Sequence, residues 1–363
     1  MKQKIGIVTF HCSYNYGSIL QTYALQKYIS KEFGDVKIIN YVSKDFEQYR
    51  LFRYTYYKRP GYFFEDLRYL TKNYRRMRSF KSFSKNYLKL TSNIYYKLES
   101  MRELNDEFDA FICGSDQIWN PGCTFGLNPV YFLGFANPNK KRIAYAPSIA
   151  CNYVSDEILQ KFKNYLTYLD SISVREEKGR DILKLATDKT VSVVLDPTLL
   201  LDKEDYVELL SDNKNGEYIF VYMLEGIDKK MLEYAEMLSK NKNIPIIYIS
   251  KNNLSIFSNS KNFYGISPNE FLNLLSNAKY IVTNSFHATV FSIIFEKNFC
   301  TFKTETSSSR MVDLLNKLNL NYRLYNELFD IDENINYFEV KENLNSYRRE
   351  SIKYLEGNLD KKK

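Results

Sequence analysis

The chain has 363 residues, 44% of them hydrophobic, and a formal net charge of +8. This length is typical of two folded domains, each large enough to bury its own core. No apolar run reaches the ~18–20 residues that span a bilayer, and the first residues do not resemble a signal peptide. The five cysteines are scattered and lack metal-ligand spacing, which favours a reduced, cytoplasmic protein without structural zinc or another metal site.

The first half of the chain alternates strand-like and helical patterns. Helices are expected over residues 19–30, 156–166 and 176–185, each between apolar runs. Such alternation predicts a parallel sheet with helices on both faces. The expected strands are residues 5–10, 36–41, 110–113, 142–146, 171–174 and 191–195.

A basic segment interrupts this series at residues 50–97, which contain thirteen Lys and Arg residues but only two Asp and Glu residues. We expect a mostly helical insertion in the first domain, with several arginines exposed. The simplest interpretation is a solvated helix with a basic outer face. The second interpretation is that the segment contacts an anionic membrane or glycan. Binding of nucleic acid is not expected, because no recognition motif accompanies the charge.

A second α/β series follows the polar stretch SDNKNG at residues 211–216. We expect two doubly wound, Rossmann-like domains, residues 1–205 and 206–363, divided near residues 203–216 and facing each other across a cleft. The second domain would include a C-terminal helix at 343–355. Its other elements are strands at 218–223, 246–250, 280–283 and 299–303 and helices at 229–239, 269–276, 288–295 and 310–317.

Both histidines of the chain, His11 and His287, follow a predicted strand and precede a predicted helix. Open parallel sheets bind ligands at the carboxyl ends of their strands. Histidine is also the side chain best suited to move protons near neutral pH. Either histidine alone could be a structural turn residue, but two in matching positions favour a functional site. Asn15, in the turn with His11, is a candidate substrate-binding residue.

Three further candidates of the first half follow predicted strands. Ser115 and Asp116 come after residues 110–113, where Asp116 could act as a base, accept a bond from a hydroxyl or cap a turn. Arg175 comes after residues 171–174 and suits a carboxylate or phosphate, although a salt bridge to Glu176 or Glu177 is the simpler alternative.

In the second half, Asn284 and Ser285 lie between a strand and a helix. Free N–H groups at a helix start attract anions, so these residues and His287 could form a phosphate site with an adjacent proton donor. As a plain cap and turn they need no function. Arg310 follows the polar loop TETSSS, which could close over a ligand.

Taken together, the stretches of sequence around these candidate residues resemble the polysaccharide pyruvyl transferase family. The similar stretches are KIGIVTFHCSYNYGSILQTYALQ, FDAFICGSDQIWNP, RIAYAPSIA, SISVREEKG, VLDPTLLL, YIVTNSFHATVFSIIFEKNF and SSSRMVDLLNKLNL, in that order from residue 4 to about 320.

The resemblance implies a GT-B-like, two-domain enzyme that moves a pyruvyl group from phosphoenolpyruvate to a sugar of a cell-surface polysaccharide or its precursor, forming a ketal. It implies no cofactor beyond this donor. His287 matches the family's donor-site histidine, Phe286 matches the leucine before it, and Ser285 stands where the family has arginine. Arg175 resembles another donor-binding arginine of the family.

In this chemistry His287 would be the acid, and Asp116 or His11 would deprotonate the acceptor hydroxyls. Two alternatives remain open. One is a GT-B-type glycosyltransferase that uses a nucleotide sugar. The other is a non-catalytic member of a polysaccharide assembly complex. The expected partners are phosphoenolpyruvate and a sugar or glycan, including a lipid-linked one, with peripheral contact at the inner membrane surface through residues 50–97.

Overall fold

The structure is a computed structural model that describes residues 3–43, 60–211, 216–224, 228–250, 257–304 and 308–361. The chain divides into two compact units. Unit 1 comprises Met1–Tyr56, Ser84–Leu201 and Asn345–Lys363, and unit 2 comprises Tyr57–Phe83 and Asp202–Leu344. Of the residues named above as the basic segment, 50–59 lie outside the described part of the chain, as do 212–215 of the polar stretch.

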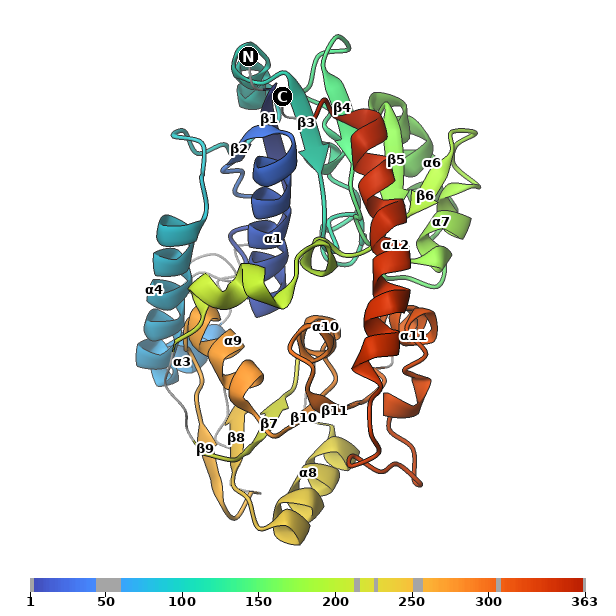
Figure 1. Cartoon of the computed structure of the whole chain (residues 1–363). Helices are drawn as coiled ribbons and strands as arrows, with labels where there is room; N and C mark the ends of the chain where they lie inside the picture. Colours follow the sequence, from blue (N-terminus) through green and yellow to red (C-terminus); the bar gives the residue numbers. More distant parts are fainter. Residues whose placement is uncertain are drawn as a thin grey trace. The chain divides into compact units, whose positions relative to one another are not determined.

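Unit 1 is built on a six-stranded parallel sheet with the strand order β2-β1-β3-β4-β5-β6 (Figure 1). Apolar residues fill these short strands, as expected of a sheet that is buried on both faces. All six strands predicted for the first half are present. They are β1 (Gln3–Val8), β2 (Gly34–Ile38), β3 (Ala110–Cys113), β4 (Lys141–Ala144), β5 (Ser171–Val174) and β6 (Val191–Val193).

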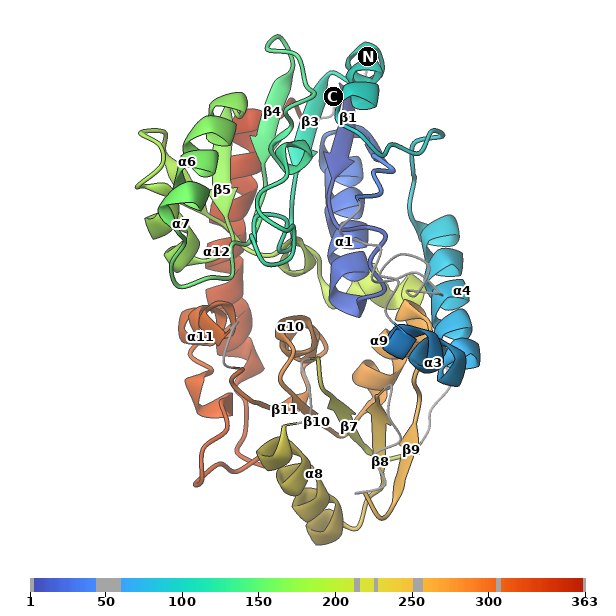
Figure 2. The ribbon, with the colours of Figure 1, turned by 180° about the vertical axis from the view of Figure 1, so that it is seen from behind.

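Helices cover both faces of this sheet. Figures 1 and 2 show α1 (Tyr16–Glu32) and the end of α12 (Tyr337–Asn358) on one face, and α6 (Asp156–Tyr165) and α7 (Glu177–Leu183) on the other. A short helix, α5 (Leu104–Glu107), precedes β3. This arrangement confirms the doubly wound sheet predicted for the first half.

The C-terminal helix does not belong wholly to the second half, contrary to the expected domain 206–363. Residues from Asn345 onward form part of unit 1. The Tyr354 hydroxyl donates to the Ala144 carbonyl (2.9 Å), and the Ser351 hydroxyl accepts from the Leu195 amide (2.9 Å). These contacts attach the end of α12 to the sheet of the first half.

Unit 2 contains a five-stranded parallel sheet with the order β11-β10-β7-β8-β9. The four predicted strands are present, and the short edge strand β9 (Ser260–Asn262), which is polar and exposed, was not predicted. The other strands are β7 (Ile219–Tyr222), β8 (Ile246–Ile249), β10 (Tyr280–Thr283) and β11 (Asn298–Thr301). The helices predicted here are α8 (Lys229–Lys242), α9 (Pro268–Asn277), α10 (Phe286–Ile294) and α11 (Ser308–Lys317).

The described part of the basic segment is helical, as predicted, and forms α3 (Pro60–Arg68) and α4 (Leu70–Tyr87). Residues up to Phe83 nevertheless group with unit 2 and not with the first domain. The reason is a close approach at Gly265, whose φ is +83° and where an added Cβ would lie 3.2 Å from the Lys72 carbonyl oxygen. Glycine lets the backbone of α4 pack against this loop.

The division between the units falls after Leu201, slightly before the expected boundary at 205/206. The 3-10 helix η6 (Lys203–Leu209) accounts for the shift. Its Tyr206 is fully buried, and its ring centroid lies 5.3 Å from that of Phe291 in α10. No helix in the described part of the chain is both long enough and apolar enough to cross a membrane.

Candidate functional site

The turn after β1 holds His11 and Asn15. Asn15 is the N-cap of α1, and its side-chain oxygen accepts from the amides of Gly17 (2.9 Å) and Ser18 (3.3 Å). This fixes Asn15 as a helix cap. The His11 ring is buried, with Nδ1 3.3 Å from the Thr9 carbonyl oxygen and Nε2 3.2 Å from the Asn40 side-chain oxygen. Both neighbours orient the ring at the carboxyl end of β1.

Burial lowers the pKa of His11 below its ordinary value of 6.5, against the smaller opposing effects of Asn40 and Thr9. The ring is therefore neutral at pH 7 and has the protonation state that a general base requires.

The lowered pKa of His11 predicts a specific loss of stability in acid. Below about pH 6.5 the unfolded chain binds a proton at this ring that the folded chain does not bind, so the free energy of unfolding falls as the pH decreases. His11 alone contributes up to about 1.4 kcal/mol per pH unit in this window. Urea denaturation between pH 7.5 and pH 5.5 should show a shallower decline for His11→Gln than for the wild type. If the free energy of unfolding fell equally with pH in both proteins, the lowered pKa of His11 would be contradicted.

The turn after β3 lies next to the turn of His11. The Thr9 hydroxyl donates to the Ser115 carbonyl (3.2 Å), and the Ser115 amide donates to the Gln21 side-chain oxygen (3.2 Å). The Ser115 hydroxyl donates to the Ala146 carbonyl (2.7 Å) after β4. Ser115 is fully buried and connects three neighbouring turns, so its own role is structural.

Asp116 adopts a left-handed backbone conformation with φ of +70° and is 5% exposed. Its Oδ1 accepts from the Gln117 amide (2.8 Å), as expected of a turn cap. Its Oδ2 is buried and has no hydrogen-bond partner among the described residues. Buried carboxylate oxygens are almost always hydrogen-bonded, so this oxygen is suited to accept from a ligand hydroxyl.

Arg175, after β5, forms a buried ion pair with Asp196, which follows the neighbouring strand β6. Glu177, one of the two alternative partners that we considered from the sequence, pairs with Arg180 (2.6 Å). The signal for Asp196 was its place before Pro197, directly after a strand.

Glu176 is a buried residue that sequence reasoning missed as a site candidate. Its Oε1 accepts from the Ser148 hydroxyl (3.0 Å) and from the amides of Ile149 (2.8 Å) and Ala150 (3.0 Å). Its Oε2 is buried without a hydrogen-bond partner in the described part of the chain. Ser148 also donates its amide to the Asp116 carbonyl (2.7 Å), so the turns that carry the two carboxylates are in contact.

Trp119, which follows the turn of Asp116, is fully buried. Its ring stacks on Phe132 at 4.8 Å, and its indole nitrogen donates to the Tyr131 carbonyl (2.8 Å). Trp119 is therefore a core anchor of unit 1.

In unit 2, the strand β10 leads into α10 through Asn284 and Ser285. Ser285 is the N-cap, and its hydroxyl accepts from the Ala288 amide (3.4 Å). The Asn284 side-chain oxygen accepts from the Leu224 amide (2.8 Å), which joins this turn to the end of β7. Both side chains therefore have structural roles, and the helix start that they organise lies at the carboxyl end of the sheet.

His287 lies in the first turn of α10, with its ring centroid 5.2 Å from that of Phe286. The Arg310 guanidinium lies over the Phe286 ring, 5.5 Å from its centroid. Arg310 is 5% exposed and belongs to α11, in agreement with the helix predicted at 310–317. Residues 305–307 of the polar loop before it lie outside the described part of the chain. The Thr301 hydroxyl donates to the Met311 sulfur (2.7 Å), which attaches α11 to β11.

The structure thus forms two groups of candidates, one in each unit. His11, Asn15, Ser115, Asp116 and Arg175 follow the strands of unit 1. Asn284, Ser285, His287 and Arg310 surround the start of α10 in unit 2. That both groups line one cleft stays a prediction.

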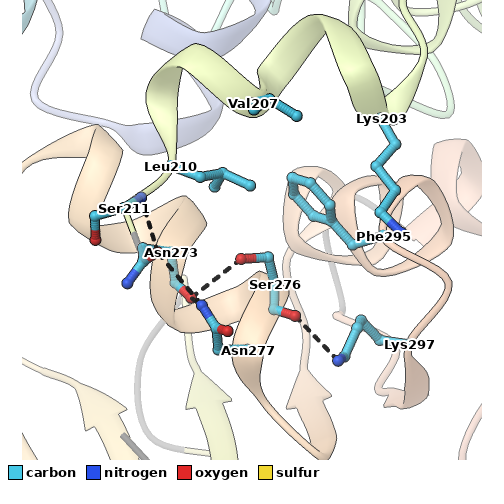
Figure 3. Close-up of a pocket in the computed structure, with 9 residues that line it drawn as sticks. All are labelled: Lys203, Val207, Leu210, Ser211, Asn273, Ser276, Asn277, Phe295 and Lys297. Atoms are coloured by element: carbon cyan, nitrogen blue, oxygen red, sulfur yellow. Dashed lines mark hydrogen bonds between the residues drawn. The ribbon is translucent and has the colours of Figure 1, made fainter. Parts of the chain in front are cut away.

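A pocket of about 620 Å³ in unit 2 lies elsewhere (Figure 3). Lys297, which donates to the carbonyl of Ser276 (3.0 Å) near the end of α9, precedes β11, so the pocket lies toward the amino ends of the strands. The start of α10 lies at the opposite edge, and none of the candidates above lines the pocket. The lining residues are Lys203, Val207, Leu210, Ser211, Asn273, Ser276, Asn277, Phe295 and Lys297.

The family model described as polysaccharide pyruvyl transferase matches residues 15–306, which include every candidate except His11 and Arg310. The chain belongs to the polysaccharide pyruvyl transferase family. A comparison with curated protein sequences gave no match. The family, and with it a transferase that acts on polysaccharide, is therefore established by the match over most of the chain.

Solved structures similar to this pyruvyl transferase family member share its fold. The UDP-GlcNAc 2-epimerase from Neisseria meningitidis bound to UDP-GlcNAc has a TM-score of 0.52 at 11% identity, covering 99% of this chain and 95% of that chain. The S. aureus MnaA–UDP structure has a TM-score of 0.51 at 12% identity, covering 97% of this chain and 88% of that chain. These similarities confirm two Rossmann-like domains of the GT-B type.

Proposed function

We propose that this protein transfers the pyruvyl group of phosphoenolpyruvate to two hydroxyls of one sugar in a polysaccharide or its precursor. The observation that carries the proposal is the family match over residues 15–306. Two features of the site support it. A histidine and an arginine adjoin a helix start in unit 2, and a buried carboxylate oxygen in unit 1 has capacity to accept a hydrogen bond.

Phosphoenolpyruvate carries a phosphate and a carboxylate, and both need cationic or N–H partners. The start of α10 supplies N–H groups and a favourable helix dipole. The resemblance implies that Ser285 stands where the family has arginine. Arg310, whose guanidinium lies over the ring of Phe286 at the first position of α10, would supply a cation there instead. Arg175 is the proposed second arginine, and its pairing with Asp196 orients it.

The proposed reaction needs one acid and two bases. His287 delivers a proton to the methylene carbon, so that the central carbon takes on positive character. One sugar hydroxyl adds to this carbon and gives up its proton, inorganic phosphate leaves, and the second hydroxyl adds and gives up its proton. Asp116 and the neutral His11 are the proposed bases. No metal or cofactor takes part in these steps.

Donor binding tests the proposal against its alternatives. Phosphoenolpyruvate should raise the melting temperature, because a ligand that binds only the folded state stabilises it. With a panel of acceptor sugars it should also release inorganic phosphate. Stabilisation by UDP-sugars and not by phosphoenolpyruvate would favour a glycosyltransferase. A protein that binds neither donor and releases no phosphate would favour a non-catalytic assembly role.

Replacing Ser285 with arginine tests the donor site directly. The added guanidinium should tighten phosphoenolpyruvate binding by about tenfold, the effect of one charge-assisted hydrogen bond. The matched control is Ser285→Ala, which also removes the cap on the Ala288 amide, at about 1 kcal/mol of stability, but adds no cation. Weaker phosphoenolpyruvate binding in Ser285→Arg than in Ser285→Ala, measured by calorimetry, would show that the pocket is shaped for another donor.

A further inference from the structure

Helix α4 has two chemically different faces. Its inner face is attached to unit 2. Arg76 donates to the Tyr264 hydroxyl (3.2 Å), and the Ser79 hydroxyl donates to the Gly265 carbonyl (3.1 Å), while Phe80 is buried. These contacts fix the orientation of the helix.

The outer face of α4 carries a stripe of three cations, Arg75, Arg78 and Lys81, which we call the cationic stripe. All three are exposed, and their spacing of three residues places them along one side of the helix. Helix α4 contains no acidic residue. None of the three forms an ion pair with a residue in the described part of the chain. The stripe is therefore an unneutralised positive surface.

Exposed apolar side chains lie on α3 and at the start of α4. A single residue, Tyr69, separates α3 from α4, and both views show the two helices side by side (Figures 1 and 2). Phe64 is 70% exposed and Leu67, one turn further on, is 56% exposed. Tyr74, at the start of the cationic stripe, is 50% exposed. Large apolar side chains gathered beside cations are typical of surfaces that contact lipid bilayers.

We infer that α3 and α4 form a docking surface for an anionic lipid bilayer, with Phe64 and Leu67 entering the headgroup boundary and the cationic stripe contacting lipid phosphates. The charge of the stripe complements an anionic leaflet. Leu67 favours lipid over nucleic acid or glycan, because an aliphatic side chain offers no stacking face to a base or sugar but gains from burial in an apolar layer. None of the residues of the proposed reaction belongs to α3 or α4.

Co-sedimentation of the full-length protein with vesicles tests the inference. Vesicles of phosphatidylcholine mixed with phosphatidylglycerol should bind the protein, and pure phosphatidylcholine should bind it much more weakly. Binding should fall steeply between about 0.05 M and about 0.5 M NaCl, since salt screens exposed charges. Binding that is equal for both vesicles, or that does not change with salt, would overturn the inference.

Neutralising the cationic stripe tests whether it forms the part of the surface that binds the membrane. The triple variant Arg75→Gln, Arg78→Gln, Lys81→Gln should partition onto anionic vesicles about 100-fold more weakly, given the usual contribution of each cation near a membrane. The matched control removes three exposed lysines of unit 1 through Lys163→Gln, Lys178→Gln and Lys184→Gln. It should bind nearly as well as the wild type. Equal losses in the two triples would show that net charge alone, and no docking surface, causes binding.

The apolar part has its own variant, Phe64→Ser with Leu67→Ser, which should weaken binding by about tenfold or more while keeping the salt dependence. Circular dichroism and melting temperature should match the wild type for all variants, because these side chains are exposed and glutamine is a good helix former. Retained vesicle binding in this double variant would overturn the insertion of α3. Tight binding to heparin or RNA, without vesicle binding, would assign the surface to a polyanion instead.

Discussion

Replacing His287 with alanine is expected to lower the rate of phosphate release from phosphoenolpyruvate and acceptor by about 10²–10⁴-fold, the usual effect of losing a general acid. Phosphoenolpyruvate binding should change much less, because the helix start, Ser285 and Arg310 remain in place. An assay of inorganic phosphate release measures the effect on the rate. Calorimetric titration with phosphoenolpyruvate measures the effect on donor binding.

A second variant distinguishes proton transfer from packing at His287. His287→Gln restores most of the side-chain volume and its hydrogen-bonding capacity but cannot deliver a proton near neutral pH. If His287 is the acid, glutamine and alanine should be similarly inactive. Activity restored by glutamine would assign the residue to packing beside Phe286, and unchanged activity in both variants would exclude it from catalysis.

Replacing Asp196 with alanine is expected to lower the free energy of unfolding by about 3–5 kcal/mol, because it leaves the Arg175 guanidinium buried without its counter-charge. Asp196 also accepts from the Thr198 amide (3.0 Å), so the turn after β6 loses a cap as well. Urea denaturation followed by circular dichroism measures the change.

Two controls isolate the buried charge. The double variant Arg175→Met with Asp196→Leu removes both charges and should cost less than Asp196→Ala alone. Glu107→Ala breaks an ion pair with Lys37 that is partly exposed (2.6 Å) and should cost no more than about 1 kcal/mol. Similar losses for Asp196→Ala and Glu107→Ala would mean that the Arg175 charge remains solvated or finds another partner.

Several functional positions could be predicted from the sequence because they depend on local patterns. An apolar run that ends in a polar turn identified the places of His11, Asp116 and His287, and a helical pattern follows each of the two histidines. Each does follow a strand of a parallel sheet. In the described part of the chain the same patterns predicted ten strands and missed the polar edge strand β9, which has no apolar run to reveal it.

Contacts between distant residues were decided by the tertiary structure. Asp196 reaches Arg175 because β6 pairs with β5, a neighbour relation that no local pattern specifies. Arg310 lies over Phe286 because α11 packs beside α10. Only the folded chain shows that one buried carboxylate oxygen in Asp116 and one in Glu176 can still accept a hydrogen bond from a ligand.

The sequence by itself determined the two α/β halves, the family and the basic character of α4, since composition and periodicity are properties of the chain. The tertiary structure decided which half the basic helix and the end of α12 join. Helix α4 packs on Gly265, where the missing side chain permits close approach, and α12 hydrogen-bonds to Ala144 and Leu195. Such assignments depend on surface complementarity between segments far apart in sequence, which periodicity does not encode.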